Sequence, residues 1–202
     1  MEANTRAARV TVRPIDVGSL GAYSVAATSG TIAAGAVANA PVFSFRWGDA
    51  TRVCLVRKVS VAMASLATGF AAGIGQLGFI IARGFSSSDS GGIVLTLTGN
   101  NAKRRTSFGS TLVTDSRISS TGALTAGTRT LDTNDASLLQ FAVGTATNTV
   151  MLATMPIWSP DWAGDWPLVL VQNEGFIIRA TVPATGTWQV QVCVEWCETA
   201  AF

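Results

Sequence analysis

Residues 165–198 decide the fold, and they read DWPLVLVQNEGFIIRATVPATGTWQVQVCVEWCE. This stretch holds three apolar runs, at residues 168–171, 176–182 and 188–196. The short separators between them, Asn-Glu-Gly at 173–175 and Pro-Ala-Thr-Gly at 183–186, contain residues that favour tight turns. The stretch therefore predicts three strands joined as an antiparallel meander.

The last run has the strictest pattern. Every second residue along it is apolar and large, namely Trp188, Val190, Val192, Val194 and Trp196. A period of two puts these five side chains on one face of a strand, and that face must be buried against a second layer. Residues 188–196 are therefore expected to form a core strand of a sandwich or barrel.

The chain carries few charges. Of its 202 residues, 13% are charged and 48% are hydrophobic, and the mean hydropathy is +0.38. An average soluble domain has roughly 25% charged residues, so a large part of this surface is expected to be covered by partner proteins. A membrane is the alternative explanation for such an apolar composition. The net charge of +2 is too small to favour nucleic acid as a specific ligand.

Residues needed for common catalytic and metal sites are missing. The sequence has no histidine, which excludes Ser-His-Asp and Cys-His catalysis and His-type zinc sites. Its three cysteines lack the spacing of a zinc site or a disulfide framework, and reduced thiols fit assembly in a cytoplasm. Paired acids, such as Asp161 with Asp165 or Glu195 with Glu198, are the remaining catalytic possibility. No motif places a metal, phosphate or cofactor, and we expect no enzymatic activity.

Residues 1–41 are expected to form an extended N-terminal arm, followed by a single domain at 42–202. The arm is rich in small residues and contains one aromatic side chain, so it cannot bury enough apolar area to fold alone. Arg6, Arg9 and Arg13 make its beginning basic. These arginines either contact a neighbouring subunit or an acidic surface, or belong to a solvated tail.

Residues 59–82 contain no charge, and a transmembrane helix is one interpretation of them. Against it, five glycines crowd residues 69–84, and larger and smaller side chains alternate at the start of the segment. We therefore expect a strand, a loop and a second strand. Residues 73–78 match the dinucleotide motif GxGxxG, but a strand rather than a helix is expected there, so the match is attributed to chance.

One short helix is expected at about residues 101–113, because Phe108 and Leu112 are four residues apart. It would carry the consecutive cations Lys103, Arg104 and Arg105. These cations either meet a carboxylate-rich neighbour or phosphate, or form a solvated helix face.

Three tryptophans, Trp158, Trp162 and Trp166, follow one another at spacings of four around Ser-Pro-Asp-Trp-Ala-Gly at 159–164, which has the signature of one helical turn. The rings either form an aromatic platform for a sugar or a protein, or close the end of a β-sandwich.

Further strands are expected at residues 42–47, 53–61, 93–97, 138–143 and 150–157, with one or two more within 117–131. Turn residues separate these runs at short intervals. The sequence therefore predicts an all-β antiparallel sandwich of about eight strands.

Two groups of short motifs in the second half of the chain carry a family resemblance. The first comprises NEGFIIR at 173–179, GTW at 186–188, and Glu195, Trp196 and Glu198. The second comprises SDSGG at 88–92, LTGNNAK at 97–103 and LTAGTRTL at 124–131. Together they resemble a family of small virion structural proteins of tailed bacteriophages.

The resemblance implies a jelly-roll type of sandwich and a virion part rather than a reaction. It points to a capsid decoration or minor capsid protein, assembled in the host cytoplasm and located in the virion. The expected partners are the major capsid protein or other virion proteins and further copies of this chain, with a trimer favoured, and neither a specific nucleic acid nor a membrane. The alternative is a neck, tail or fibre component that binds carbohydrate through Trp158, Trp162 and Trp166.

Overall fold

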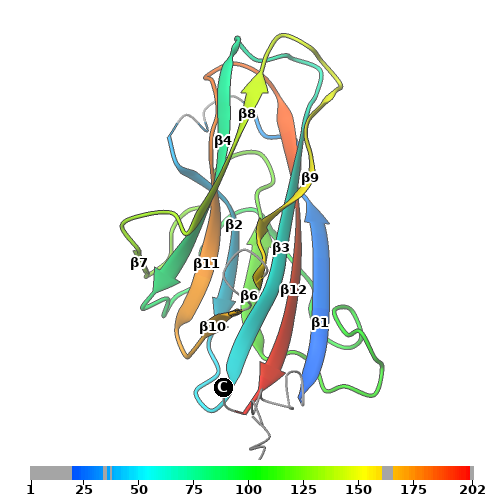
Figure 1. Cartoon of the computed structure of the whole chain (residues 1–202), viewed down its shortest axis with the longest axis vertical. Helices are drawn as coiled ribbons and strands as arrows, with labels where there is room; N and C mark the ends of the chain where they lie inside the picture. The colour runs from blue at the N-terminus through cyan, green and yellow to red at the C-terminus, as the bar shows by residue number, and fades with distance from the viewer. Residues whose placement is uncertain (1–19, 34–35, 37, 161–165, 201–202) are drawn as a thin grey trace, which may run out of the picture.

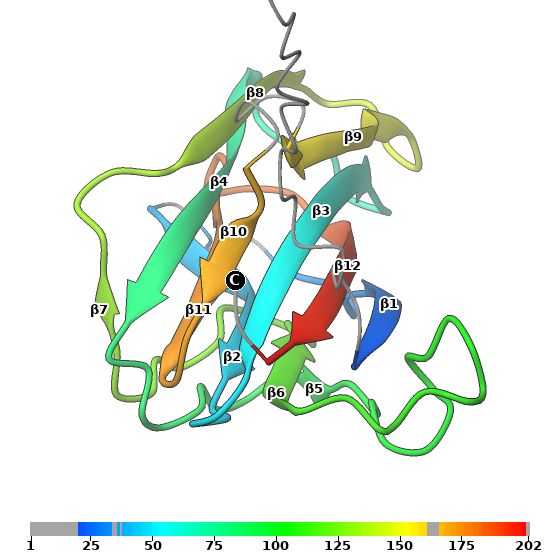
Figure 2. The same cartoon turned by 60° about the horizontal axis from the view of Figure 1, so that its bottom comes forward.

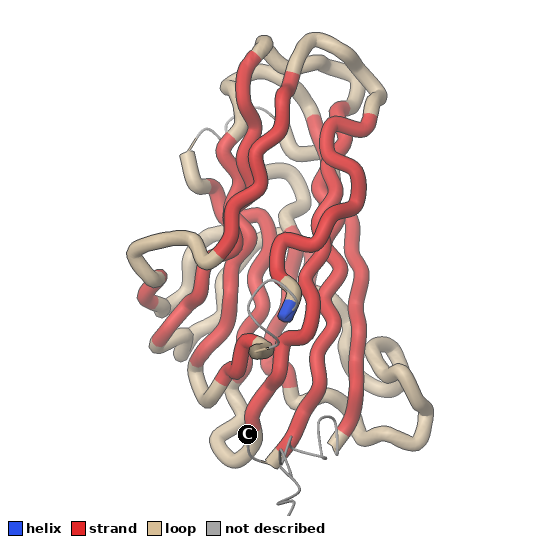
Figure 3. The backbone as a smooth tube through the Cα atoms, in the orientation of Figure 1, coloured by secondary structure: helices blue, strands red, loops and turns tan. Residues whose placement is uncertain are grey.

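The chain crosses repeatedly between two antiparallel sheets that pack face to face (Figure 1). The computed structural model describes residues 20–33, 36, 38–160 and 166–200. Twelve strands lie in this part of the chain. Loops make up nearly all of the rest, and the short helical segment drawn in Figure 3 includes Pro160. The expected all-β sandwich is confirmed, with more strands than the sequence indicates.

Sheet A has five strands. Its order is β1 (Gly21–Thr28), β12 (Trp188–Thr199) and β3 (Val53–Ser65), with β10 (Leu168–Leu170) and β9 (Val150–Trp158) both paired to the far side of β3. The first part of β3 pairs with β10 and the later part with β9. β12 pairs with β1 on one side and with β3 on the other, so it lies inside the sheet.

Sheet B has seven strands. Its order is β5 (Ile93–Val94), β6 (Val113–Ile118), β2 (Ala40–Trp47), β11 (Glu174–Thr181) and β4 (Gly73–Arg83), with β7 (Thr130–Leu131) and β8 (Ser137–Val143) paired to the far side of β4. Figure 2 shows this layer beside β3, β12 and β1 of sheet A.

Aromatic side chains from both sheets fill the space between the layers. Trp188 and Trp196 of β12 are buried, as the alternating pattern predicts. Trp196 meets Phe45 of sheet B edge to face, with ring centroids 5.3 Å apart and planes at 71°. Phe45 in turn stacks on Phe176 at 5.1 Å. Each fully buried ring contributes about 1.5–3 kcal/mol of transfer free energy, so these contacts hold the two sheets together.

The three predicted strands of residues 165–198 all exist, as β10, β11 and β12, but the predicted meander is wrong. β10 and β12 both pair with β3 in sheet A, whereas β11 pairs with β2 and β4 in sheet B. Alternation and turn residues specify which residues form a strand and which face is buried, but they do not specify the neighbouring strand.

The boundary expected at residue 41 is also wrong. β1 begins at Gly21 and is hydrogen-bonded to β12 along its whole length. Tyr23, Ile32 and Ala36 are buried in the common core. The sandwich therefore includes residues on the N-terminal side of residue 41, and residues 1–19 lie outside the described part of the chain.

No helix forms at residues 101–113, which make a loop with turns. The loop extends beside β1 (Figures 1 and 2). Its backbone pairs with that strand, because Ser24 donates from its N–H to the Ala102 carbonyl (2.8 Å) and Arg104 donates to the Ala22 carbonyl (3.0 Å). Pairing with a strand edge satisfies polar groups that a helix would have paired internally.

Residues 59–82 form a strand, a loop and a strand, as predicted. They comprise the later part of β3, the connection, and nearly all of β4. The GxGxxG match at 73–78 therefore lies within β4. No helix in the described residues is long and apolar enough to cross a membrane.

Candidate interaction surface

The outer face of sheet A, which points away from the core, consists of rows of directly opposed residues on β1, β12 and β3. These rows are Thr28–Gln191–Ala62, Ala26–Cys193–Ser60 and Ser24–Glu195–Lys58. The valines and tryptophans of β12 occupy the opposite, inner face. The side chains of the first two rows carry no charge, and all except Gln191 are small.

A groove of about 300 Å³ lies on these two rows. Its lining comes from β1, β3, β9 and β12 and includes Ala26, Ser60, Ala62, Thr154, Gln191 and Cys193. None of its lining residues carries a formal charge at neutral pH. Because the side chains are short, another polypeptide can approach the backbone of the sheet closely.

A group of cations, which we call the basic band, crosses the end of the same face. It consists of Arg57, Lys58 and Arg104. Arg104 lies in the loop beside β1 and forms an ion pair of 2.8 Å with Glu195 of β12. Its neighbour Lys103 pairs with Tyr23 of β1, so the Lys103 side chain lies on the same side of the sheet as the buried Tyr23 ring and not on the outer face. Lys58 of β3 lies directly opposite Glu195. The band therefore runs from the loop, across β1 and β12, to β3.

The sequence drew attention to Lys103, Arg104 and Arg105 but not to Arg57 and Lys58. The first three lie in a loop rather than on a helix, and their side chains take different partners. Arg105 covers the Phe108 ring, with its guanidinium carbon 5.6 Å from the ring centroid. In the sequence, Arg57 and Lys58 are simply two charges next to an uncharged segment. The structure shows that both are exposed on β3, and the register of β3 with β12 places Lys58 opposite Glu195.

Arginines on the outer face of sheet B bind loop residues. Arg46 of β2 donates to the carbonyls of Phe85 (2.6 Å) and Ser86 (2.7 Å). Arg179 of β11 forms a bidentate pair with Asp135, with both distances 2.8 Å. Bidentate pairing gives these contacts a defined geometry, so the loops are fixed to the sheet.

The most deeply buried ion pair lies beneath the same loops. Asp89 and Arg129 are in contact, and both side chains are almost fully buried. Asp89 also accepts a hydrogen bond from the Gly127 N–H at 2.9 Å. The Arg129 guanidinium lies over the Phe85 ring at 5.4 Å. The pair thus joins the loop at residues 84–92 to the loop at residues 124–130.

Glu198 is a buried carboxylate that the sequence did not identify as such. The residue is 1% exposed, and its Oε1 accepts hydrogen bonds from Thr111 Oγ1 (2.5 Å), Leu112 N–H (3.0 Å) and Trp196 Nε1 (3.2 Å). Burial raises the pKa of this carboxyl above its ordinary value of 4.5, and the three hydrogen bonds oppose that rise. Glu195 faces outward instead, so the two acids do not form a catalytic pair.

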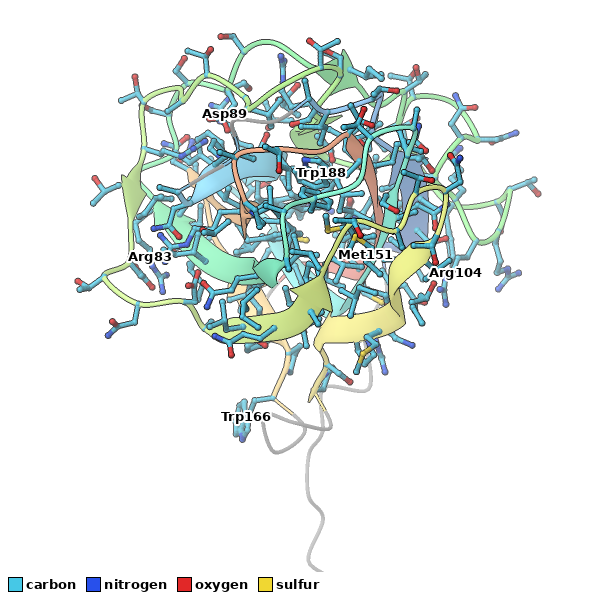
Figure 4. The ribbon with its side chains drawn as sticks, turned by 90° about the horizontal axis from the view of Figure 1, so that it is seen from above. Arg83, Asp89, Arg104, Met151, Trp166 and Trp188 are labelled. Carbon is cyan, nitrogen blue, oxygen red and sulfur yellow. The ribbon has the colours of Figure 1, made fainter. Side chains whose placement is uncertain are left out.

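The predicted tryptophan cluster is only partly described. Trp158 stacks on Phe79 of the core, with ring centroids 5.3 Å apart. Trp166 is 68% exposed and projects from the body of the molecule (Figure 4). Trp162 lies outside the described residues, as do Arg6, Arg9, Arg13, Asp161 and Asp165. Of the two described rings, one packs on the core and one faces solvent.

The described residues contain no group of three or more Cys, Asp or Glu side chains placed to share a metal ion. The three cysteines are free, with Cys54 and Cys197 buried and Cys193 partly exposed on the outer face of sheet A. Comparison of the chain with protein-family models, with curated proteins and with solved structures found no match.

Proposed function

We propose that this chain is a non-enzymatic structural protein of a tailed-bacteriophage virion, a capsid decoration or minor capsid protein that binds the assembled shell. The outer face of sheet A is the observation that carries the proposal. It offers a preformed, uncharged groove next to a basic band, in a chain of which only 13% is charged. A surface of this kind suits non-covalent binding across joints between shell subunits.

The strand order supports the jelly-roll part of the proposal. Eight strands are arranged as β1-β12-β3-β9 in sheet A and β2-β11-β4-β8 in sheet B. Consecutive members of this set alternate between the sheets, except for β4 and β8, which are neighbours in sheet B. Such an order is expected for two Greek keys wrapped into a jelly roll, an architecture that viral capsid proteins use, and it supports this part of the proposal. β5, β6 and β7 lie in the connection between β4 and β8.

The fixed loops on sheet B support the same role. A protein that strengthens a shell must itself resist deformation, and Arg46, Arg179 and the Asp89–Arg129 pair hold the loops against the sheet. Copies of the chain are proposed to act as oligomers, with a trimer matching the threefold positions of a shell.

Binding to empty shells tests the proposal. Shells assembled without this chain are incubated with the purified protein and sedimented. The expected result is saturable binding at a fixed ratio to the major capsid protein, together with a higher temperature of shell disruption. Failure to sediment with shells, in a preparation whose fold is intact, would contradict it.

The second candidate is a neck, tail or fibre component that binds carbohydrate, and the exposed ring of Trp166 favours it. Titration with host polysaccharide separates the two functions. A saturable change in tryptophan fluorescence that Trp166→Ala abolishes supports carbohydrate binding, whereas a decoration protein gives no such change.

A further inference from the structure

We propose that the outer face of sheet A is the docking surface for an acidic polypeptide, whose carboxylates pair with the basic band while its uncharged side chains enter the groove. The identification of that polypeptide as a virion protein rests on the proposed function. Its acidic chemistry rests on the charges of this face alone.

The shape of the face is the first step. The opposed residues Ala26, Cys193 and Ser60 lie in one row, and Thr28, Gln191 and Ala62 lie in the next. These residues line the groove of about 300 Å³, and apart from Gln191 their side chains are short. A groove of this size accepts a few side chains of an extended or flat partner rather than a whole helix.

The charge of the face is the second step. The band brings three exposed cations together, Arg57, Lys58 and Arg104, and Glu195 is the carboxylate that the structure places among them. Among the described residues of this face, the band therefore has a surplus of positive charge. A partner with several carboxylates supplies the complement.

Five arginines elsewhere in the described chain have partners within their own molecule. Arg46, Arg83, Arg117, Arg129 and Arg179 each bond to carboxylates or carbonyls of their own molecule. Figure 4 shows Arg104 of the band and Arg83 on opposite sides of the molecule. These five arginines thus have partners within their own molecule, whereas Arg57, Lys58 and Arg104 outnumber the carboxylate beside them, next to the groove.

A polypeptide fits this surface better than a nucleic acid. Proteins that bind single strands combine cations with exposed aromatic rings on which the bases stack. The groove is instead lined by Ala, Ser, Thr, Val, Gln and Cys. Phe108, an aromatic ring next to the band, is already covered by the guanidinium of Arg105.

Binding of a model acidic polypeptide provides the first test. Fluorescein-labelled poly-L-glutamate is titrated with the purified full-length chain, and binding is followed by anisotropy. The double variant Arg57→Gln/Lys58→Gln is compared with Arg52→Gln/Arg83→Gln, which removes two cations elsewhere. We expect roughly tenfold weaker binding for the first variant and less than about twofold for the second, because only the first removes cations of the band.

Two results of that titration would overturn the proposal. Equal loss of affinity in the two variants would mean that net charge, and not this face, attracts the polyanion. Tighter binding of oligo-dT than of poly-L-glutamate, with the same dependence on Arg57 and Lys58, would assign the band to phosphate.

Cys193 reports on the groove in the second test. Of the three cysteines, Cys54 and Cys197 are buried, so a maleimide reacts first at Cys193. Burial and the neighbouring Glu195 raise the pKa of the Cys193 thiol, so the reaction is compared at one mildly alkaline pH. We expect alkylation of Cys193 to be several-fold slower in intact particles than in the free protein. Equal rates would overturn the assignment of this face as the docking surface.

The experiments distinguish failure of the proposed function from failure of the acidic docking surface. Absence of the chain from particles, combined with loss of poly-L-glutamate binding only in Arg57→Gln/Lys58→Gln, would contradict the proposed function and support the acidic docking surface. Presence in particles with unprotected Cys193 would support the proposed function and contradict this inference.

Discussion

Tyr23 of β1 stacks on Trp196 of β12, with ring centroids 5.6 Å apart and planes inclined by 20°. The Tyr23 hydroxyl also donates a hydrogen bond to the Gly109 carbonyl at 3.1 Å. One side chain thus connects the first strand, the last strand and the loop that carries part of the basic band. The integrity of the docking face depends on this contact.

Tyr23→Ala is expected to lower the free energy of unfolding by about 3–5 kcal/mol, because it removes a fully buried ring from the core. Tyr23→Phe keeps the ring and loses the hydroxyl bond, so a loss of about 1 kcal/mol is expected. Urea unfolding followed by tryptophan fluorescence measures both. A loss below about 1 kcal/mol for Tyr23→Ala would contradict the assignment of β1 to the core.

Deletion of residues 2–38 is expected to prevent folding. It removes β1 and the buried side chains of Tyr23 and Ile32, and it leaves the β12 edge unpaired. Deletion of residues 2–19 is the matched control, since it retains all of β1. Circular dichroism and size-exclusion chromatography compare the two. A folded product from the longer deletion would show that β1 is dispensable.

Asp89→Asn is expected to cost about 3–5 kcal/mol, because it leaves the buried Arg129 guanidinium without a countercharge. Asp132→Asn is the control, since Asp132 pairs with Arg83 in an exposed ion pair and should cost less than about 1 kcal/mol. Both values come from urea unfolding at neutral pH. Similar small losses in the two variants would mean that the buried pair does not hold the loops of sheet B.

Glu198→Gln is expected to change how stability depends on pH. Since burial raises the pKa of Glu198 in the folded state, the folded protein holds a proton that the unfolded chain has already lost above pH 4.5. The contribution of this group is therefore fully present below the unfolded pKa and is lost as pH rises through the folded pKa.

The stability of the wild type relative to Glu198→Gln should therefore fall as the pH rises above 4.5 and through the raised pKa of the folded-state carboxyl. Glu195→Gln, at an outward-facing carboxylate, serves as the control and should show no comparable fall. Urea unfolding at several pH values gives the comparison. A difference that stays constant, or that grows with pH, would contradict burial of the Glu198 carboxylate.

The sequence predicts best what depends on local pattern. Alternation along β12 correctly assigns Trp188 and Trp196 to the core, because strand periodicity and burial are properties of one segment. Strand partners depend on distant segments, and for that reason the meander prediction fails. β1 escapes detection because its eight residues, GAYSVAAT, are mostly small and owe their order to pairing with β12.

The candidate surface could be predicted only in part, for the same reason. Lys103, Arg104 and Arg105 stand out as consecutive cations, but Arg57 and Lys58 are far from them in sequence. Glu195 lies opposite Lys58 and pairs with Arg104, and this register brings Arg104, but not Lys103 or Arg105, to the cations of β3. The helix expected at residues 101–113 is replaced by a loop because Glu198 and β1 supply distant hydrogen-bond partners.

The number of copies of this chain per purified particle tests the central claim most directly. It is measured by quantitative mass spectrometry of virions, with the major capsid protein as the internal reference. A shell decoration protein predicts on the order of hundreds of copies, in a simple ratio to the shell subunit. A count of about a dozen would place the chain in the neck or tail, and absence from the particle would contradict a role in the virion.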